Sequence, residues 1–387
     1  MRFPHAVAAL GLVVLTSCAG SLASTPGGTG SPSEVPVRDG SRFVAMNAGG
    51  AERPAHQGGC PDPAQFDTTT LARSLIMVGV SGDTTEIPAW LGADGTPGSG
   101  AFVIDGEDGL SSGSFAALAR EPDSPLIAVD YEGGLVSRHA FQFSEAPSAA
   151  EQAAQSTPSQ VRELAAAKGR AMRSVGVNTD FAPVVDLNLG SPIVGSRSFG
   201  SEPDQVIAYA GAFAAGLHDA GVLPVLKHFP GHGSAAGDSH QGLPTTDSWD
   251  QLRSRDLLPY RSLLAQPGPW AVMVGHLHVP GLSSDGELPT SLDPATYRVL
   301  RDDLHFTGPA ITDDLADMRA VTDRMSTPEA VVRAIAAGAD QALLAEPDNY
   351  QAAVAALADW GAADVGHRQR MLEAARRLAT VLPCGRN

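Results

Sequence analysis

The sequence has 387 residues, of which 43% are hydrophobic, and it carries 26 basic against 43 acidic side chains, a net charge of −17 at pH 7. This length and apolar content allow one large α/β domain, or two smaller domains, with a sizeable core. The acidic balance argues against a nucleic-acid partner and against electrostatic docking on an anionic membrane, and an aromatic content of 5% leaves few stacking platforms.

Residues 1–18 have the features of an export signal. Arg2 supplies a positive start, and the following apolar stretch, Ala6 to Leu15, is too short to span a bilayer. The segment ends in Leu15-Thr-Ser-Cys18, which resembles a bacterial lipobox, where the cysteine is lipidated and becomes the mature N-terminus. The alternative is an ordinary secretory peptide with an incidental cysteine. In either case we expect an extracytoplasmic protein, and with lipidation a lipoprotein anchored to the cell membrane.

Residues 19–59 are rich in Gly, Pro, Ser and Thr and have no apolar periodicity, which predicts a flexible tether. Residues 60–387 would then form the folded domain. Cys60 and Cys384 lie at its two ends, so a disulfide between them would close the domain in an oxidising compartment. The alternative is two buried free thiols.

Short apolar or β-branched runs alternate with helical patterns from residue 67 onward. Eight strand–helix units predict a single (β/α)8 TIM-type barrel of the α/β class, with a doubly wound open sheet as the alternative. The predicted strands are Ser74–Val80, Ala101–Asp105, Leu126–Asp130, Thr179–Val185, Leu223–His228, Ala271–His276, Pro309–Thr312 and Gln341–Ala345. The clearest predicted helices are Gln160–Val175, Asp204–Ala220, Asp256–Ala265, Pro294–Leu304 and Pro328–Ala337.

Polar side chains follow five of the predicted strands at the ends where a barrel carries its active site. Each alone could cap a helix or a turn, but together they favour one pocket. They are Asp130 to Arg138 after the third strand, Asp186 to Asn188 after the fourth, Lys227 and His228 in the fifth, His276 and His278 after the sixth, and Asp313 with Asp314 after the seventh.

The densest group of titratable residues runs from Lys227, one of only two lysines in the chain, to His240. His228 and His232 have the i, i+4 spacing of a helical zinc pair, but Pro230 is incompatible with that helix, so we expect no metal. Asp238 and His240 lie two residues apart, and in an extended loop their side chains share one side. They therefore have the outline of an acid/base dyad.

Several motifs together resemble glycoside hydrolase family 3, in its β-N-acetylglucosaminidase branch. They cover nearly the whole folded part in the order of the family. The motifs are Val129-Asp-Tyr-Glu-Gly-Gly134 with Arg138, Asn178-Thr-Asp-Phe-Ala-Pro-Val-Val-Asp-Leu-Asn188, Gly195-Ser-Arg-Ser-Phe-Gly200, Lys227-His-Phe-Pro-Gly-His-Gly233 with Asp238-Ser-His240, and Ile311-Thr-Asp-Asp-Leu-Ala-Asp-Met318. Tyr131 and Leu135 stand where relatives often have glutamine and arginine, which leaves the outer contacts of the pocket open.

The resemblance implies a retaining β-N-acetylglucosaminidase without a cofactor. Asp313 would be the nucleophile, and Asp238 with His240 the acid/base dyad. Strand alternation alone does not choose between Asp313 and Asp314. The residues implied to hold the terminal sugar are Asp130, Arg138, Arg197, Lys227 and His228.

The expected partners are N-acetylglucosamine-containing saccharides or muropeptides from cell-wall fragments, bound by a monomer that touches the membrane only through its lipid anchor. The alternatives are a glycosidase of other specificity, a phosphorylase that uses phosphate in place of water, a metal-dependent hydrolase built on His228, His232 and His240, and a non-catalytic sugar-binding lipoprotein.

The loop before the dyad is rich in small residues, with Gly231, Gly233 and Gly237 around a Ser-Ala-Ala segment. This composition predicts a weakly packed, mobile loop that closes when substrate fills the pocket. The strand end that carries Lys227 and His228 should be rigid by comparison.

Overall fold

The computed structural model describes residues 61–80, 100–103, 125–137, 143, 145–266, 268–283 and 288–382. Within these ranges, none of the helices combines the length and apolarity needed to cross a bilayer. The expected signal and tether lie outside the described residues, as do Cys18, Cys60, Arg138 and Cys384.

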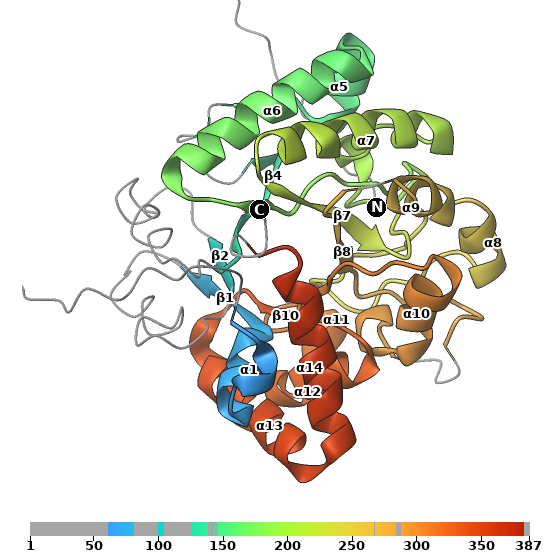
Figure 1. The fold of residues 1–387 in the computed structure, drawn as a ribbon. Helices are drawn as coiled ribbons and strands as arrows, with labels where there is room; N and C mark the ends of the chain where they lie inside the picture. The colour runs from blue at the N-terminus through green and yellow to red at the C-terminus, as the bar shows by residue number, and fades with distance from the viewer. Residues whose placement is uncertain are drawn as a thin grey trace, which may run out of the picture. The chain divides into compact units, whose positions relative to one another are not determined.

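Eight parallel strands form a closed barrel, which confirms the predicted (β/α)8 architecture and rules out an open sheet. Their order around the barrel is β1-β10-β9-β8-β7-β6-β3-β2. Each predicted strand overlaps one of them, and every strand residue except Asp313 is buried because helices and loops cover the barrel outside (Figure 1). The strands are β1 Ile76–Val80, β2 Gly100–Val103, β3 Ile127–Val129, β6 Thr179–Asp180, β7 Leu223–Phe229, β8 Ala271–Val274, β9 Ala310–Asp314 and β10 Gln341–Leu344.

One predicted strand is much shorter than expected. The run from Thr179 to Val185 pairs as a strand only at its first two residues. Pro183 follows a cis bond and has no N–H to donate, and beyond it only Val184 makes an isolated bridge, to Lys227. The rest of the run is irregular and leads directly into Asp186.

The five predicted helices are all present, four of them with bounds within two residues of the expected ones, while the α-helix expected over Pro294–Leu304 ends at Arg298 and continues as a π-helical turn to Asp303. Capping residues explain where they begin: Thr157 with Gln160 and Ser326 with Glu329 form capping boxes, each followed by proline at the start of the helix. The α-helices are α1 Thr68–Ser74, α5 Ala149–Gln155, α6 Pro158–Val175, α7 Pro203–Asp219, α8 Trp249–Ser254, α9 Leu257–Leu264, α10 Pro294–Arg298, α11 Arg319–Thr322, α12 Thr327–Ala337, α13 Tyr350–Ala363 and α14 Val365–Ala379.

Shorter elements complete the chain. A π-helical turn, η4 Val299–Asp303, continues α10, so that the predicted helix of this region is one helix with a change of pitch. The 3-10 turns are η1 Pro63–Gln65, η2 Gly195–Arg197, η3 Thr290–Leu292 and η5 Pro347–Asn349. Around the barrel, α6 packs against α7, and α13 packs against both α12 and α14 (Figure 1).

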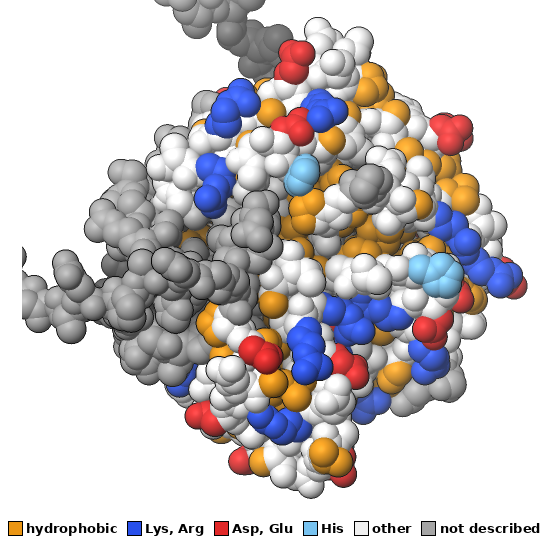
Figure 2. All heavy atoms as spheres, viewed as in Figure 1, with side chains coloured by type: hydrophobic (Ala, Val, Ile, Leu, Met, Phe, Trp, Pro, Cys, Tyr) orange, Lys and Arg blue, Asp and Glu red, His pale blue; other side chains and the backbone are white. Residues whose placement is uncertain are grey.

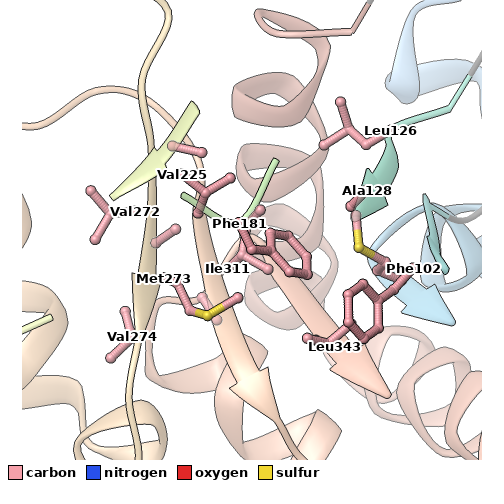
Figure 3. Packing of buried hydrophobic residues seen from close by; sticks show 14 of the residues in the cluster. Phe102, Leu126, Ala128, Phe181, Val225, Val272, Met273, Val274, Ile311 and Leu343 are labelled. Atoms are coloured by element: carbon pink, nitrogen blue, oxygen red, sulfur yellow. The ribbon is translucent and has the colours of Figure 1, made fainter. Parts of the chain in front are cut away.

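Apolar side chains fill the inside of the barrel (Figure 3). The rings of Phe102 and Phe181 stack there with centroids 5.1 Å apart. Met273 and Leu343 lie beside them, and all four side chains also line a cavity at the carboxyl ends of the strands. The top of the hydrophobic core is therefore the floor of that cavity.

Strand β7 has an irregularity where it enters the cavity. Its pairing with β8 shifts so that Lys227 and His228 together lie opposite Met273. Such a bulge re-aims the side chains next to it, because the two-residue alternation of the strand is interrupted. As a result the adjacent residues Lys227 and His228 both line the cavity.

A second irregularity lies on β9. There Thr312 and Asp313 lie opposite the single residue Ala342 of β10. Regular alternation would send Asp313 and Asp314 to opposite faces, but with the bulge both border the cavity. The two strands that carry Lys227, His228, Asp313 and Asp314 are thus both bulged at the cavity.

Candidate active site

The cavity at the carboxyl ends of the barrel strands has a volume of about 340 Å³. Its floor is apolar and its walls are polar, as in sites that hold a small molecule by a few directed hydrogen bonds. The polar and charged residues that line it are Asp130, Arg197, Lys227, His228, His232, Ser239, His240, Asp313, Asp314, Asp317 and Glu346.

Lys227 is the centre of a charged group on one wall. Its ammonium nitrogen lies 2.7 Å from Asp130 Oδ1 and 2.7 Å from Glu132 Oε1. Arg197 donates to both oxygens of Glu132, at 2.8 and 2.7 Å, in a bidentate pair. Burial opposes the charge of Lys227, but the two carboxylates outweigh it and raise its pKa, so the ammonium stays protonated.

Glu132 is a buried site residue to which the sequence reasoning assigned no role. It lies in a hairpin of β4 Tyr131–Gly133 and β5 Val136–Ser137, whose turn uses Gly134 at φ +61°. Burial alone would raise the pKa of Glu132, but Lys227 and Arg197 lower it instead. The Glu-Gly-Gly sequence directly after a strand was the available signal, because a carboxylate before a tight turn can reach back to the strand ends.

The other lysine of the chain supports this hairpin from behind. Lys168 of α6 is buried, and its ammonium nitrogen donates to the carbonyl oxygens of Tyr131 at 3.0 Å and Glu132 at 3.3 Å. It also lies 4.2 Å from the centre of the Tyr131 ring. Burial lowers the pKa of Lys168. The hairpin that presents Glu132 is therefore fixed from the helix side.

Asp186 is the second residue whose role the sequence reasoning left open. It is buried below the cavity and lies 2.7 Å from Nδ1 of His228, and it also accepts the backbone N–H groups of His228 and His232. Its carboxylate therefore keeps the hydrogen of His228 on Nδ1. The opposite nitrogen, Nε2, is left with Arg197 at 3.5 Å.

Asp313 and Asp314 are neighbours with different surroundings. Both oxygens of Asp314 accept backbone N–H groups, from Ala316 at 3.0 Å, Asp317 at 2.9 Å and Ala345 at 2.7 Å. Asp313 accepts only the N–H of Asp314, through Oδ1 at 2.9 Å, among the hydrogen bonds of the described residues. Asp314 therefore holds the loops together, while Asp313 has an oxygen available to a ligand.

The charge of Asp313 is favoured by its surroundings. Burial would raise its pKa, but His228, His276, the Asp314 N–H and Lys227 together lower it. For Asp314 burial dominates and raises the pKa. Of the two carboxyl groups, Asp313 is thus the one whose surroundings favour the ionised form.

His276 does not line the cavity, although the sequence placed it with the site residues. It is fully buried, with Nδ1 2.6 Å from the hydroxyl of Ser291 and Nε2 2.7 Å from the carbonyl oxygen of Asp314. It therefore fixes the end of β9. His278 lies farther along the same connection, next to Thr245.

Asp238 and His240 form the predicted contact. Oδ1 of Asp238 lies 2.8 Å from Nδ1 of His240 and 2.9 Å from its backbone nitrogen. The geometry differs from the extended loop that the sequence predicted, because the Asp238 side chain accepts the N–H two residues on and closes a turn. The His240 side chain is 59% exposed and lines the cavity, so both solvent and a ligand can reach its ring.

The loop before the dyad is better packed than its composition predicted. Gly231 and Gly233 are buried, and a Cβ atom on Gly233 would lie 2.2 Å from the Leu187 carbonyl oxygen. Ala235 belongs to a small separate core of Leu252, Leu277 and Val279. The glycines serve close backbone approach rather than freedom of movement, so the prediction of weak packing is wrong for this half of the loop.

The far half of the loop is held at two points. Ala236 donates to the Thr245 carbonyl at 2.8 Å, and the carbonyl oxygen of the buried Ser239 accepts the N–H of Ala320, in α11 after β9, at 3.0 Å. Between these points Gly237 is exposed and has a φ of +113°. The dyad loop is therefore tied to the chain that leaves Asp313.

The three histidines of a possible metal site are engaged elsewhere. Nδ1 of His228 and of His240 pairs with an aspartate, and Nδ1 of His232 lies 3.4 Å from the Ser191 hydroxyl. No group of three or more His, Cys, Asp and Glu side chains in the described ranges is placed to hold a metal ion.

Comparison with known proteins places this architecture in a family. The model described as "Glycosyl hydrolase family 3 N terminal domain" matches residues 115–381. A protein named Beta-hexosaminidase LpqI, from Mycobacterium tuberculosis (strain ATCC 25618 / H37Rv), is 52% identical over 225 residues, which are 56% of this chain and 57% of that protein. The chain thus matches little more than half the length of this relative.

Two other matches cover more of the proteins concerned. A Beta-hexosaminidase from Stenotrophomonas maltophilia (strain K279a) is 32% identical over 288 residues, 71% of this chain and 84% of that protein. The crystal structure of a glycosyl hydrolase of the GH3 family from Mycobacterium smegmatis str. MC2 155 has a TM-score of 0.76 and 42% identity, over 83% of this chain and 99% of that chain.

Proposed function

The chain belongs to glycosyl hydrolase family 3, and from this membership we propose that it is a β-N-acetylhexosaminidase that removes terminal N-acetylglucosamine. One observation carries the proposal. A single cavity is lined by a carboxylate with a free oxygen, Asp313, by the exposed imidazole of His240, and by the Lys227 group on its wall. A retaining glycosidase needs these three functions in one place.

Asp313 acts as the nucleophile. Its free oxygen attacks the anomeric carbon as the bond to the leaving oxygen breaks, and a covalent glycosyl-enzyme forms. The lowered pKa of Asp313 keeps the group ionised for this step. Asp314 is less suited, because its oxygens already accept three backbone N–H groups.

His240 acts as the acid and then as the base. With Asp238 accepting the hydrogen on Nδ1, the protonated ring carries its second hydrogen on Nε2 and donates it to the leaving oxygen. The neutral ring then accepts a proton from the water that hydrolyses the intermediate. The His240 hydrogen bonds outweigh burial and lower the pKa of Asp238, so the carboxylate stays charged and stabilises the imidazolium.

Asp130, Lys227, Arg197 and His228 bind the sugar, together with Arg138, which lies outside the described residues. The four described residues, together with Glu132, form one network in which acceptors and donors alternate, as a ring of hydroxyl groups requires. Because Glu132 and Asp186 hold the cations and the imidazole in place, the network is formed before the sugar arrives.

Hydrolysis of a chromogenic N-acetyl-β-glucosaminide tests the proposal. We expect turnover of this substrate, and much less of the corresponding glucoside. No turnover of any chromogenic glycoside would leave a sugar-binding protein. Formation of sugar 1-phosphate in phosphate buffer would identify a phosphorylase.

We propose further that the natural substrates are cell-wall fragments and that the mature protein is a lipoprotein, with residues 1–18 as signal and 19–59 as tether. The lipobox-like sequence that ends at Cys18 supports this. Cys18→Ala should release the protein from the membrane fraction with unchanged turnover. Continued membrane partition of the variant would contradict the anchor. The bridge between Cys60 and Cys384 belongs to the same extracytoplasmic proposal.

A further inference from the structure

A second charged group lies at the opposite end of the barrel, where the strands begin. Asp340 directly precedes β10, is completely buried, and accepts the backbone N–H of Ala310, the first residue of β9, at 2.9 Å. Arg301, Arg370 and Arg377 all pair with this one carboxylate. Three cations therefore converge on a single anion.

The three guanidinium groups are only partly compensated. Arg298 adds a fourth to the same pocket, while Asp302 and Glu373 are its only acidic lining residues. With Asp340 below them, four cations face three carboxylates, in a chain whose overall charge is −17. Burial lowers the pKa of Arg301, and repulsion from Arg377 and Arg370 adds to this effect, which Asp340 only partly offsets. The pocket therefore has a positive excess.

Unused hydrogen-bond donors are available there. Arg370 donates through Nε and Nη2 to the carbonyl oxygens of Ile335 and Ala339 and to Asp340, but its buried Nη1 has no partner among the described residues. Arg298 is exposed and forms no ion pair with any described residue. A guanidinium group has five N–H donors in a fixed fork, so both residues have donors to spare.

The pocket itself is small and lies between α10 with η4 on one side and α14 on the other, with a volume of about 190 Å³. Basic side chains gather on this face of the molecule, with acidic ones among them (Figure 2). Arg301 and Arg370 are about five-sixths buried, with 17% and 16% of their side chains exposed. Partial desolvation strengthens their attraction for an anion over that of a surface arginine.

We propose that this arginine pocket, lined by Arg298, Arg301, Arg370 and Arg377, binds a phosphate group, either free or as a phosphate ester. Phosphate offers several acceptor oxygens and a double negative charge, which the forked donors of several arginines match. The site is at the start of β9 and β10, whereas Asp313 is near the end of β9. Phosphate bound here cannot reach the sugar, and it leaves the catalytic cavity open.

Inorganic phosphate is the first probe. Thermal unfolding of the full chain is followed with increasing phosphate, against chloride at equal ionic strength. We expect a saturable rise in Tm with phosphate. The apparent phosphate affinity taken from this rise should be at least about tenfold weaker in Arg298→Gln. It should be unchanged in Arg376→Gln, because Arg376 is an exposed arginine of α14 outside the pocket. No saturable rise, or the same rise in both variants, would overturn the proposal.

Vesicles then distinguish the sources of the phosphate group. Co-sedimentation of the same full-length chains with phosphatidylglycerol vesicles that is weaker for Arg298→Gln than for Arg376→Gln would assign a lipid phosphate. Equal co-sedimentation, with the phosphate effect intact, would assign a soluble or polymer-borne phosphate. Turnover of the chromogenic substrate should be the same in both variants, so failure of this proposal is distinguishable from failure of the proposed function.

Discussion

Each end of the barrel has a buried ion held by side chains of the opposite charge, but the signs of the charges are reversed between the two ends. At the carboxyl end, Asp130 and Glu132 surround the buried Lys227, and the free carboxylate of Asp313 faces the cavity. At the amino end, one carboxylate, Asp340, is hidden and the arginines face outward. One end therefore presents a carboxylate to its cavity, and the other presents guanidinium groups to its pocket.

The position of the buried charge explains the difference. A buried ion stays charged only if oppositely charged groups surround it, and the partners then occupy the accessible surface. With a lysine at the centre, a carboxylate such as that of Asp130 offers its acceptor oxygens to the cavity. With an aspartate at the centre, guanidinium groups reach the surface.

Asp313→Asn should break the carboxyl end without unfolding it. The amide cannot form the glycosyl-enzyme, so kcat should fall by at least about 10³-fold, measured with the chromogenic substrate. Asp314→Asn is the matched control, and it should mainly lower the stability, by about 1–3 kcal/mol, because an amide cannot accept all three backbone N–H groups. Near-normal turnover of Asp313→Asn would discard the assignment.

Asp340→Ala should break the amino end. Without the carboxylate, Arg301, Arg370 and Arg377 repel one another in a partly buried site, at a cost of about 3–5 kcal/mol in the free energy of unfolding. Urea denaturation measures this loss. Asp219→Ala, which removes an exposed pair with Arg162, should cost about 1 kcal/mol or less. Equal costs would mean that the arginines are not held by Asp340.

His240→Ala should distinguish proton transfer from binding. A basic leaving oxygen needs protonation, so turnover of a disaccharide should fall by about 10²-fold, and turnover of a nitrophenyl glycoside much less. Steady-state kinetics on both substrates, with His218→Ala as a surface control, measures the difference. The same loss on both substrates would leave His240 a binding role only.

Acid should weaken the carboxyl end selectively. Burial, with repulsion from His228, lowers the pKa of His232 from 6.5 to about 4, so between these values the unfolded chain binds the extra proton. The contribution of neutral His232 to the free energy of unfolding is therefore fully present above pH 6.5. It is lost as the pH falls, by about 2 kcal/mol near pH 4.5. Urea denaturation near pH 7 and near pH 4.5 should show a smaller difference in His232→Gln.

The amino end provides the control for this pH effect, because guanidinium groups stay protonated throughout the range. Arg298→Gln should keep the full difference in stability between the two pH values. A difference that persists unchanged in His232→Gln would assign the acid sensitivity to other groups.

Periodicity predicted the barrel because burial on both faces forces apolar runs in its strands, and each run recurred as a strand. It could not predict the bulges that turn His228 and Asp313 into the cavity, since register depends on pairing with a distant strand. The contact of Asp238 with His240 follows from their spacing. The roles of Glu132 and Asp186 depend on partners more than forty residues away, which spacing does not reveal.

The burial of both lysines has a practical consequence for chemical labelling. Lys168 and Lys227, the only lysines of the chain, have relative exposures of 5% and 2%, so in the native state their ammonium groups are shielded from amine-specific reagents. Acylation of either lysine requires a local opening of the structure around the β4–β5 hairpin. Lys168 lies behind this hairpin and Lys227 in front of it. Their relative rates of labelling therefore report on which side of the hairpin the opening occurs.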